Sequence, residues 1–228
     1  MIMRINQLTH PDLPPIEEGV EDFGSFKAVF MAGSPGSGKS TVRDQLFGGL
    51  GMKVVDADEV RRAYLKLGKG GDYDVYGDVV RRQRRSFMDQ RLGIIMDTTA
   101  WHLPSVAKTT AQLRELGYDV GMVHVHVPLK TALDRVQSRA AVTGRAVHEQ
   151  EVIKRFDGLK DNVRDYAHMF GDAYWFVDNS GARPRTELIA RDVRAWLAAP
   201  PSSSTAQAWI AQQRLAKQRS ASLIDQPS

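Results

Sequence analysis

Cysteine is absent from the 228 residues of this chain. Its absence excludes disulfide-stapled scaffolds, thiolate zinc sites and cysteine nucleophiles. Long hydrophobic runs are missing too, because no stretch approaches the roughly 20 apolar residues that cross a bilayer. The first residues also lack the apolar segment of a secretory signal peptide. We therefore expect no membrane partner and a cytoplasmic location.

The composition is that of an ordinary globular protein, with 42% hydrophobic and 25% charged residues. The formal net charge is +4, from 31 Lys and Arg against 27 Asp and Glu. This mild excess favours anionic partners such as nucleotides, nucleic acid or phosphosugars. Part of it is local, because Arg81, Arg82, Arg84 and Arg85 lie close together. The cluster could follow a nucleic-acid backbone or form a solvated helix surface.

Short apolar runs alternate with segments of helical spacing through most of the chain. This alternation predicts an α/β fold with a mostly parallel sheet covered on both faces. We expect residues 1–25 to form an N-terminal extension, 26–197 the domain, and 198–228 a Pro/Ser-rich linker with a C-terminal tail. The predicted strands lie within 26–33, 53–56, 93–97, 119–127 and 174–178. The predicted helices are 39–50, 59–67, 77–92, 105–116, 129–139, 149–170 and 185–197.

Three apolar residues in the tail, Trp209, Ile210 and Leu215, could dock as a short stripe. We favour a frayed tail, because chain ends are often poorly ordered.

The strongest motif is GSPGSGKST, in which Gly33, Gly38, Lys39 and Ser40 fit the pattern G-x-x-x-x-G-K-[ST]. It follows an apolar strand and precedes a predicted helix, as a phosphate-binding loop does. Glycines let the backbone surround a phosphate group, the lysine neutralises charge, and the serine can ligate Mg²⁺. We therefore predict a P-loop NTPase fold, a three-layer α/β/α sandwich with five strands and a small helical lid. The expected nucleotide-binding residues here are Gly33, Ser34, Pro35, Gly36, Ser37, Gly38, Lys39, Ser40 and Thr41.

The next predicted strand runs into a group of charged residues. Asp58 follows the carboxyl end of this strand, where doubly wound sheets bind ligands, and could accept a proton from an attacking hydroxyl. Arg61, three residues later, would share its helix face and hold an anionic group of the acceptor. Equally, Asp58 could simply cap the following helix.

The third strand ends in Asp97 after four apolar or small residues, as a Walker B strand does. Asp97 could orient Mg²⁺ together with Ser40, or line the acceptor site with Thr98. Trp101 could stack on an acceptor base or pack in the core. A capping role for Asp97 is the alternative.

Arg135 and Arg139 are four residues apart in a predicted helix, so they share a face. Adjacent guanidinium groups repel each other unless an anion lies between them, which suits a lid that closes over a triphosphate and stabilises transfer. Arg145 could add a third charge. The alternative is a solvated cationic surface.

Taken together, these motifs resemble a group of kinases that includes zeta toxins and the kinase domain of phage polynucleotide kinases. The resemblance covers about residues 26–181. It implies that Asp58 is the general base, that Arg61 binds a neighbouring phosphate, and that Asp97 and Thr98 line the acceptor site. It also places Asp178 and Asn179 beside the adenine.

The resemblance implies an ATP- and Mg²⁺-dependent kinase that phosphorylates a hydroxyl of nucleic acid or of a nucleotide-type acceptor. Our first candidate acceptor is the hydroxymethyl group of hydroxymethyluracil in phage DNA, and a phage protein of this kind would work in the host cytoplasm. A polynucleotide 5′-hydroxyl is another nucleic-acid acceptor of the same class. A zeta-toxin-like UDP-N-acetylglucosamine kinase and a nucleotide-dependent switch protein without an acceptor remain alternatives. We see no sequence signal for an antitoxin.

Overall fold

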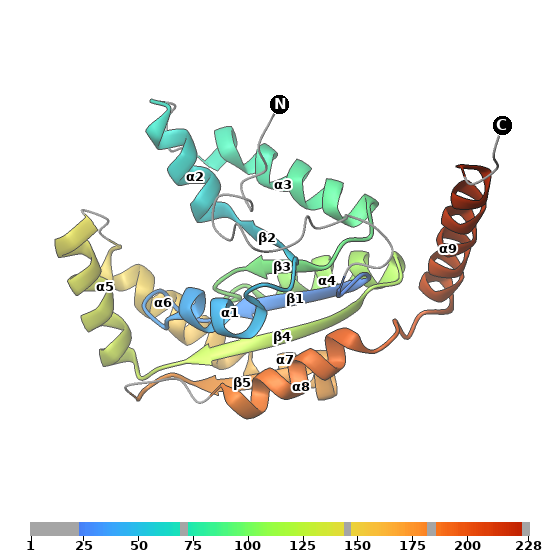
Figure 1. Cartoon of the computed structure of the whole chain (residues 1–228). Coiled ribbons are helices and arrows are strands. Elements are labelled where there is room, and N and C mark those ends of the chain that lie inside the picture. Colours follow the sequence, from blue (N-terminus) through green and yellow to red (C-terminus); the bar gives the residue numbers. More distant parts are fainter. Residues whose placement is uncertain (1–22, 69–72, 144–146, 182–185, 225–228) are drawn as a thin grey trace.

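The computed structural model describes residues 23–68, 73–143, 147–181 and 186–224. In this part of the chain, parallel strands form a sheet in the order β2-β3-β1-β4-β5 (Figure 1). The strand that carries the phosphate loop is therefore central. The strands are β1 (Lys27–Ala32), β2 (Lys53–Asp56), β3 (Ile94–Asp97), β4 (Asp119–His126) and β5 (Tyr174–Asp178).

Helices cover both faces of this sheet, so the predicted three-layer α/β/α fold is confirmed (Figure 1). Helices α1 and α8 pack on one face and α4, α6 and α7 on the other, while α5 and α6 lie beside the phosphate loop. The helices are α1 (Lys39–Phe47), α2 (Ala57–Lys66), α3 (Tyr73–Asp89), α4 (Leu103–Glu115), α5 (Leu129–Thr143), α6 (Glu149–Asp161), α7 (Val163–Phe170), α8 (Glu187–Ala198) and α9 (Ser204–Ile224).

The core has two halves because successive residues of a strand point to opposite faces of the sheet. On β1, Val29 and Met31 pack toward α1 and α8, whereas Ala28 and Phe30 pack toward α4 and α7. All six residues of β1 are buried. Burial on both faces explains why this strand is a continuous apolar run.

The single helix predicted over 149–170 is wrong, because Asn162 separates α6 from α7. The Asn162 side chain donates a hydrogen bond through Nδ2 to the carbonyl oxygen of Trp101, 3.0 Å away. Asparagine favours such side-chain bonds to the backbone over a place inside a helix.

The frayed tail favoured from the sequence is also wrong, since α9 begins directly after the Pro/Ser segment. The backbone N–H of Ser202 donates to Oδ2 of Asp119 at 3.1 Å, and Asp119 also pairs with Lys27 at 2.7 Å. The Trp209 ring lies edge-on to Phe26, with 5.4 Å between centroids. The first half of α9 is thus fixed to the sheet.

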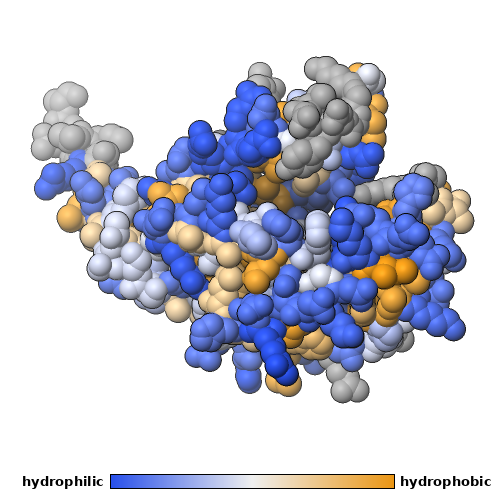
Figure 2. All heavy atoms as spheres, turned by 180° about the vertical axis from the view of Figure 1, so that it is seen from behind, coloured by the Kyte–Doolittle hydropathy of each residue, from blue (hydrophilic) through white to orange (hydrophobic). Residues whose placement is uncertain are grey.

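None of the helices in the described ranges has the length and apolarity needed to span a membrane. Seen from behind, the surface is mostly hydrophilic, and its hydrophobic residues form separate patches (Figure 2).

Candidate active site

A polar cavity of about 640 Å³ lies over the carboxyl ends of the central strands. It brings together the phosphate loop, the residues after β2 and β3, and helices α5 and α6. This is where an open α/β sheet binds its ligands. The lining residues are Ser34, Pro35, Gly36, Gly38, Lys39, Ser40, Thr41, Asp56, Asp58, Arg61, Arg62, Tyr76, Asp97, Thr99, Arg135, Arg139, Val147, His148, Glu151 and Arg155.

The phosphate loop depends on glycine at two positions where the backbone is left-handed. Gly36 has φ +82° and Gly38 has φ +87°. A Cβ at residue 36 would lie 2.3 Å from the carbonyl oxygen of Ala132 in α5, and one at residue 38 would lie 2.3 Å from Nδ2 of Asn179. Since neither position has space for a side chain, both the conformation and the packing require glycine.

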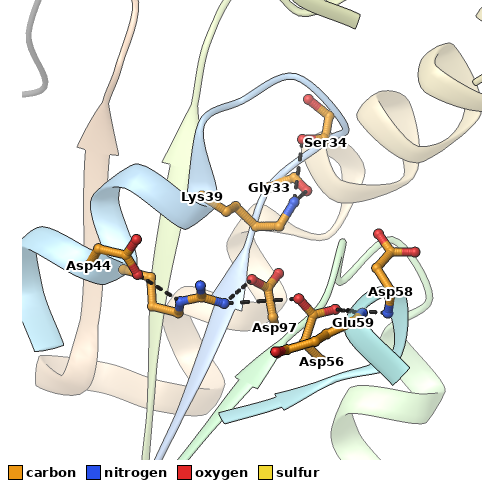
Figure 3. A network of polar contacts seen from close by, with 9 residues as sticks. Gly33, Ser34, Lys39, Asp44, Asp56, Asp58, Glu59 and Asp97 are labelled. Carbon is orange, nitrogen blue, oxygen red and sulfur yellow. Dashed lines mark hydrogen bonds and ion pairs between the residues drawn. The ribbon is translucent and has the colours of Figure 1, made fainter. Parts of the chain in front are cut away.

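Lys39 lies inside this loop, where Nζ donates to the carbonyl oxygen of Gly33 at 2.8 Å. Burial lowers the pKa of the Lys39 ammonium group, while the nearby carboxylates of Asp97, Asp58 and Asp56 act in the opposite direction. Nζ of Lys39 thus points at the loop backbone, and the three carboxylates that end β2 and β3 or begin α2 lie near it (Figure 3).

Asp56, not Asp58, caps α2. Oδ1 of Asp56 accepts hydrogen bonds from the backbone N–H groups of Asp58, at 2.8 Å, and Glu59, at 3.3 Å. The capping role that the sequence left open for Asp58 is thus taken by its neighbour. Asp58 and Arg61 line the cavity together.

Arg43 of α1 joins two strand ends. Its Nη1 lies 3.1 Å from Oδ2 of Asp97 and 4.0 Å from Oδ2 of Asp56 (Figure 3). Burial raises the pKa of the Asp97 carboxyl group, and Asp56 also raises it, whereas Lys39 and Arg43 lower it. Two like charges at neighbouring strand ends are stabilised by the cations between them.

The lid side of the cavity is strongly cationic. Arg135 and Arg139 of α5 both line it. Arg155 of α6 joins them and pairs with Glu151, with Nε 2.7 Å from Oε1. Arg145 lies outside the described residues. Several guanidinium groups around one cavity are suited to binding a polyphosphate.

Thr98 and Trp101 are not among the described residues that line the cavity, and their contact with an acceptor stays a prediction. Oγ1 of Thr98 accepts a hydrogen bond from the N–H of Ala100 and closes a turn. The Trp101 ring packs against α6, where Nζ of Lys154 lies 4.7 Å from the ring centroid. Thr99 lines the cavity in place of Thr98.

Asp178 and Asn179 are absent from the described cavity wall as well, and their place beside the adenine stays a prediction. Oδ1 of Asp178 accepts from the N–H of Ser180. Asn179 is buried behind the phosphate loop, where Nδ2 donates to the carbonyl oxygen of Ser37 at 2.7 Å. Its own carbonyl oxygen accepts from Nη2 of Arg135 at 3.1 Å. Asn179 thus holds the loop and a lid arginine in place.

Sequence reasoning missed a further group of residues, namely Arg43 beside the carboxylates and several side chains on the cavity walls. Arg43 was detectable, because it follows Lys39 by four residues and so shares its helix face. The others carry no local signal, since only the tertiary fold brings α3 and the start of α6 to the cavity. They are Tyr76, His148, Glu151 and Arg155.

Two bacterial adenylate kinases are similar in sequence to part of this chain. The enzyme of Bacteroides fragilis is 27% identical over 142 residues, which cover 56% of this chain and 75% of that enzyme. The enzyme of Porphyromonas gingivalis is 28% identical over 141 residues, which cover 56% of this chain and 73% of that enzyme.

Solved structures share the fold at low identity. The AvrRxo1-ORF1:AvrRxo1-ORF2 structure with sulphate ions has a TM-score of 0.58 and 14% identity, covering 82% of this chain and 70% of that chain. A chain of the Pnkp1/Rnl/Hen1 RNA repair complex has a TM-score of 0.53 and 21% identity, covering 61% of this chain. This chain spans less than half, 46%, of that repair protein.

The model of the zeta toxin family matches residues 17–182, which include the phosphate loop, both strand-end carboxylates and the lid arginines. Since this match spans more than half of the sequence, the chain belongs to the zeta toxin family.

Proposed function

We propose that this protein is an ATP- and Mg²⁺-dependent kinase that transfers the γ-phosphate of ATP to a hydroxyl group of nucleic acid. One observation carries the proposal: Lys39 of the phosphate loop and Asp58 after β2 line the same cavity. A phosphate-binding lysine opposite a carboxylate is the arrangement that transfer to an alcohol requires. A switch protein without an acceptor would have no use for this carboxylate.

In the proposed reaction the acceptor oxygen attacks the γ-phosphorus while the bond to the bridging oxygen of ADP breaks. The hydroxyl proton passes to the carboxylate of Asp58. Lys39, Arg135 and Arg139 supply positive charge to the phosphoryl oxygens as charge develops on them. Arg61, on the same wall as Asp58, holds an anionic group of the acceptor.

The oxygen groups of Ser40 and Asp97 would hold Mg²⁺, which when bound neutralises charge on the β- and γ-phosphates. Both residues line the cavity next to Lys39. Among the described residues, no group of three or more histidine, aspartate or glutamate side chains forms a metal cage. Protein ligands this few suit Mg²⁺, which usually takes further ligands from substrate phosphates and water.

Two observations favour a nucleic-acid acceptor. The wall beside Asp58 carries two arginines, Arg61 and Arg62, which suit a phosphate next to the reacting hydroxyl. A chain with the same fold belongs to an RNA repair complex. Our first candidate acceptor is the 5-hydroxymethyl group of hydroxymethyluracil in phage DNA, and a polynucleotide 5′-hydroxyl is the second.

Membership of the zeta toxin family supports another candidate, because the family resemblance implies a kinase that acts on UDP-N-acetylglucosamine. The same arginines could bind the diphosphate of this acceptor. The AvrRxo1-ORF1 structures contain a second protein, ORF2.

A transfer panel separates these candidates. The full chain is incubated with γ-labelled ATP and Mg²⁺ and one acceptor at a time: hydroxymethyluracil DNA, a 5′-hydroxyl oligonucleotide, UDP-N-acetylglucosamine or AMP. We expect label in one of the two nucleic acids. Label only in the sugar nucleotide would establish the sugar-nucleotide kinase, and label only in AMP would indicate an adenylate kinase.

The variant Asp58→Asn tests the mechanism in the same assay. We expect transfer to fall about 10²- to 10⁴-fold, the typical contribution of a general base, with ATP binding unchanged. Glu59→Gln is the matched control, because Glu59 adjoins Asp58 but does not line the cavity. Equal transfer by both variants would refute the role of Asp58.

A further inference from the structure

A groove between α3 and α4 lies outside the candidate active site. Its volume is about 260 Å³, and its lining contains three guanidinium groups, one carboxylate and one amide. The positive charge is therefore concentrated on one wall, which belongs to α3. The lining residues are Arg81, Arg84, Arg85, Met88, Asp89, Gln112 and Leu116.

The three arginines belong to one face of α3, because they are spaced at i, i+3 and i+4. No acidic residue occurs between Arg81 and Met88. Arg81 pairs with Asp78 at 2.5 Å, but both side chains are more than half exposed, so the pair contributes little to stability. A multivalent anion can therefore compete for this guanidinium group.

Apolar residues attach α3 to the domain. Val80, Phe87 and Met88 pack in the core beside α4 and β1. Arg81 and Arg85 are exposed and Arg84 is half-buried, so the positive charge of the three lies at the wall of the groove. Positive charge of this density at the surface attracts anions.

Helix α3 borders both the cavity and the groove. Tyr76 near its start lines the cavity, and Arg85 of the groove lies nine residues, or about 13 Å, further along the axis. At about 100° per residue, Arg84 lies roughly 80° and Arg85 roughly 180° around the helix from Tyr76, so the groove opens on another side of α3. A small acceptor would be contained in the cavity, whereas a polymer with one nucleotide in the cavity could pass around α3 to the groove.

The chemistry of the groove matches a chain of phosphates. Guanidinium groups bind phosphate oxygens in a bidentate manner, and the amide of Gln112 on the opposite wall can donate to a sugar or phosphate oxygen. We infer that the α3–α4 groove binds the sugar-phosphate backbone of a nucleic-acid acceptor whose reacting hydroxyl lies in the cavity. The inference rests on the proposed function and extends it to a polymeric substrate.

The test measures binding of a fluorescent single-stranded DNA of about 20 nucleotides to the full chain without ATP, by anisotropy at several salt concentrations. For the variant Arg81→Gln/Arg84→Gln/Arg85→Gln we expect at least about tenfold weaker binding. The slope of log K against log salt should fall by about 2, because each phosphate contact on a single strand contributes about 0.7. Wild-type affinity in this variant would overturn the inference.

The matched control is Arg164→Gln/Arg191→Gln/Arg194→Gln, which removes three exposed arginines from α7 and α8. It changes the net charge equally, so an equal loss of DNA binding in both triple variants would overturn the inference in favour of a general charge effect. A gain-of-function variant avoids any doubt about folding. Gln112→Arg adds a guanidinium group to the facing wall and should tighten binding several-fold, and no gain would contradict the inference.

Two further arms test a lipid ligand and the transfer reaction itself. Phosphatidylserine vesicles replace DNA in the first arm. If the groove variant binds these vesicles more weakly than the wild type but binds DNA equally well, the groove is a lipid site and the inference fails. The second arm measures transfer. If Asp58→Asn abolishes transfer to DNA while the groove variant binds DNA normally, the groove inference fails and the kinase proposal stands. If the groove variant loses DNA binding while no acceptor is labelled, the groove binds nucleic acid and the kinase proposal fails.

Discussion

Nη1 of Arg43 lies 3.1 Å from Oδ2 of Asp97, and so joins the helix after the phosphate loop to the strand next to β1. Both side chains are largely buried, with 18% and 10% of their areas exposed. Asp56 lies 4.0 Å from the same nitrogen, on the next strand. Arg43 therefore fixes the positions of the carboxylates at the ends of β2 and β3.

Replacing Arg43 with Met should lower kcat about 10- to 100-fold, as the loss of residues that orient metal ligands does. ATP binding should be retained, because the loop itself is intact. Steady-state kinetics at varied Mg²⁺ would check this prediction, with partial rescue by Arg43→Lys. A fall in thermal stability with unaltered kcat would mean that Arg43 is only structural.

The cap of α2 gives a prediction that separates stability from chemistry. Asp56→Ala removes the acceptor of two backbone N–H groups and should cost about 1 kcal/mol in the free energy of unfolding. Asp58→Asn should cost much less, because Asp58 does not cap the helix. Urea unfolding of both variants at pH 7 provides the measurement, and the reverse order would contradict the assignment of the cap.

Asn179 behind the phosphate loop should be sensitive to replacement. Asn179→Ala leaves the carbonyl oxygen of Ser37 without its 2.7 Å donor in a buried place, which costs about 1–3 kcal/mol. The loop should then bind ATP more weakly, although Asn179 does not line the cavity. Isothermal titration with ATP would test this. Ser180→Ala at the exposed neighbouring position is the control and should bind normally.

His124 predicts how stability depends on pH. Burial lowers the pKa of its imidazole from 6.5 to about 4, with a smaller contribution from His126. The folded state therefore excludes a proton that the unfolded chain binds, so the stabilisation is present above pH 6.5 and is lost as the pH falls toward 4. The difference between these two pKa values corresponds to roughly 3 kcal/mol.

Urea unfolding between pH 4 and 7 would measure this loss. The variant His124→Gln should flatten the dependence, since glutamine does not titrate. His102→Gln, at an exposed position, should retain it. An unchanged slope in His124→Gln would assign the dependence to other groups.

Local patterns were sufficient for the sheet and the phosphate loop. All five strands were predicted to within two residues of their observed ends, because buried parallel strands are short apolar runs that end in polar residues. The pattern that identifies the phosphate loop lies entirely within the nine residues GSPGSGKST. Asp58, Arg61 and the lid arginines followed from helical and strand spacing relative to that loop.

The errors came from residues whose environment is set by distant parts of the chain. Trp101 and Asn162 are 61 residues apart, yet Asn162, which bonds to the backbone of Trp101, lies where the predicted helix is divided into α6 and α7. The order of α9 depends on Trp209 meeting Phe26 across almost the whole sequence. Neither contact has a local signature, so spacing along the chain could not reveal it.

Helix α2 has no buried residue. It carries the proposed base and the proposed acceptor arginine, and it follows β2 at the edge of the sheet. The phosphate loop, in contrast, follows the buried central strand β1. Substitutions that reshape the acceptor wall therefore leave the hydrophobic interior untouched. Evolution can change what such a protein phosphorylates at little cost in stability, and directed evolution of new acceptor specificity should begin with this helix.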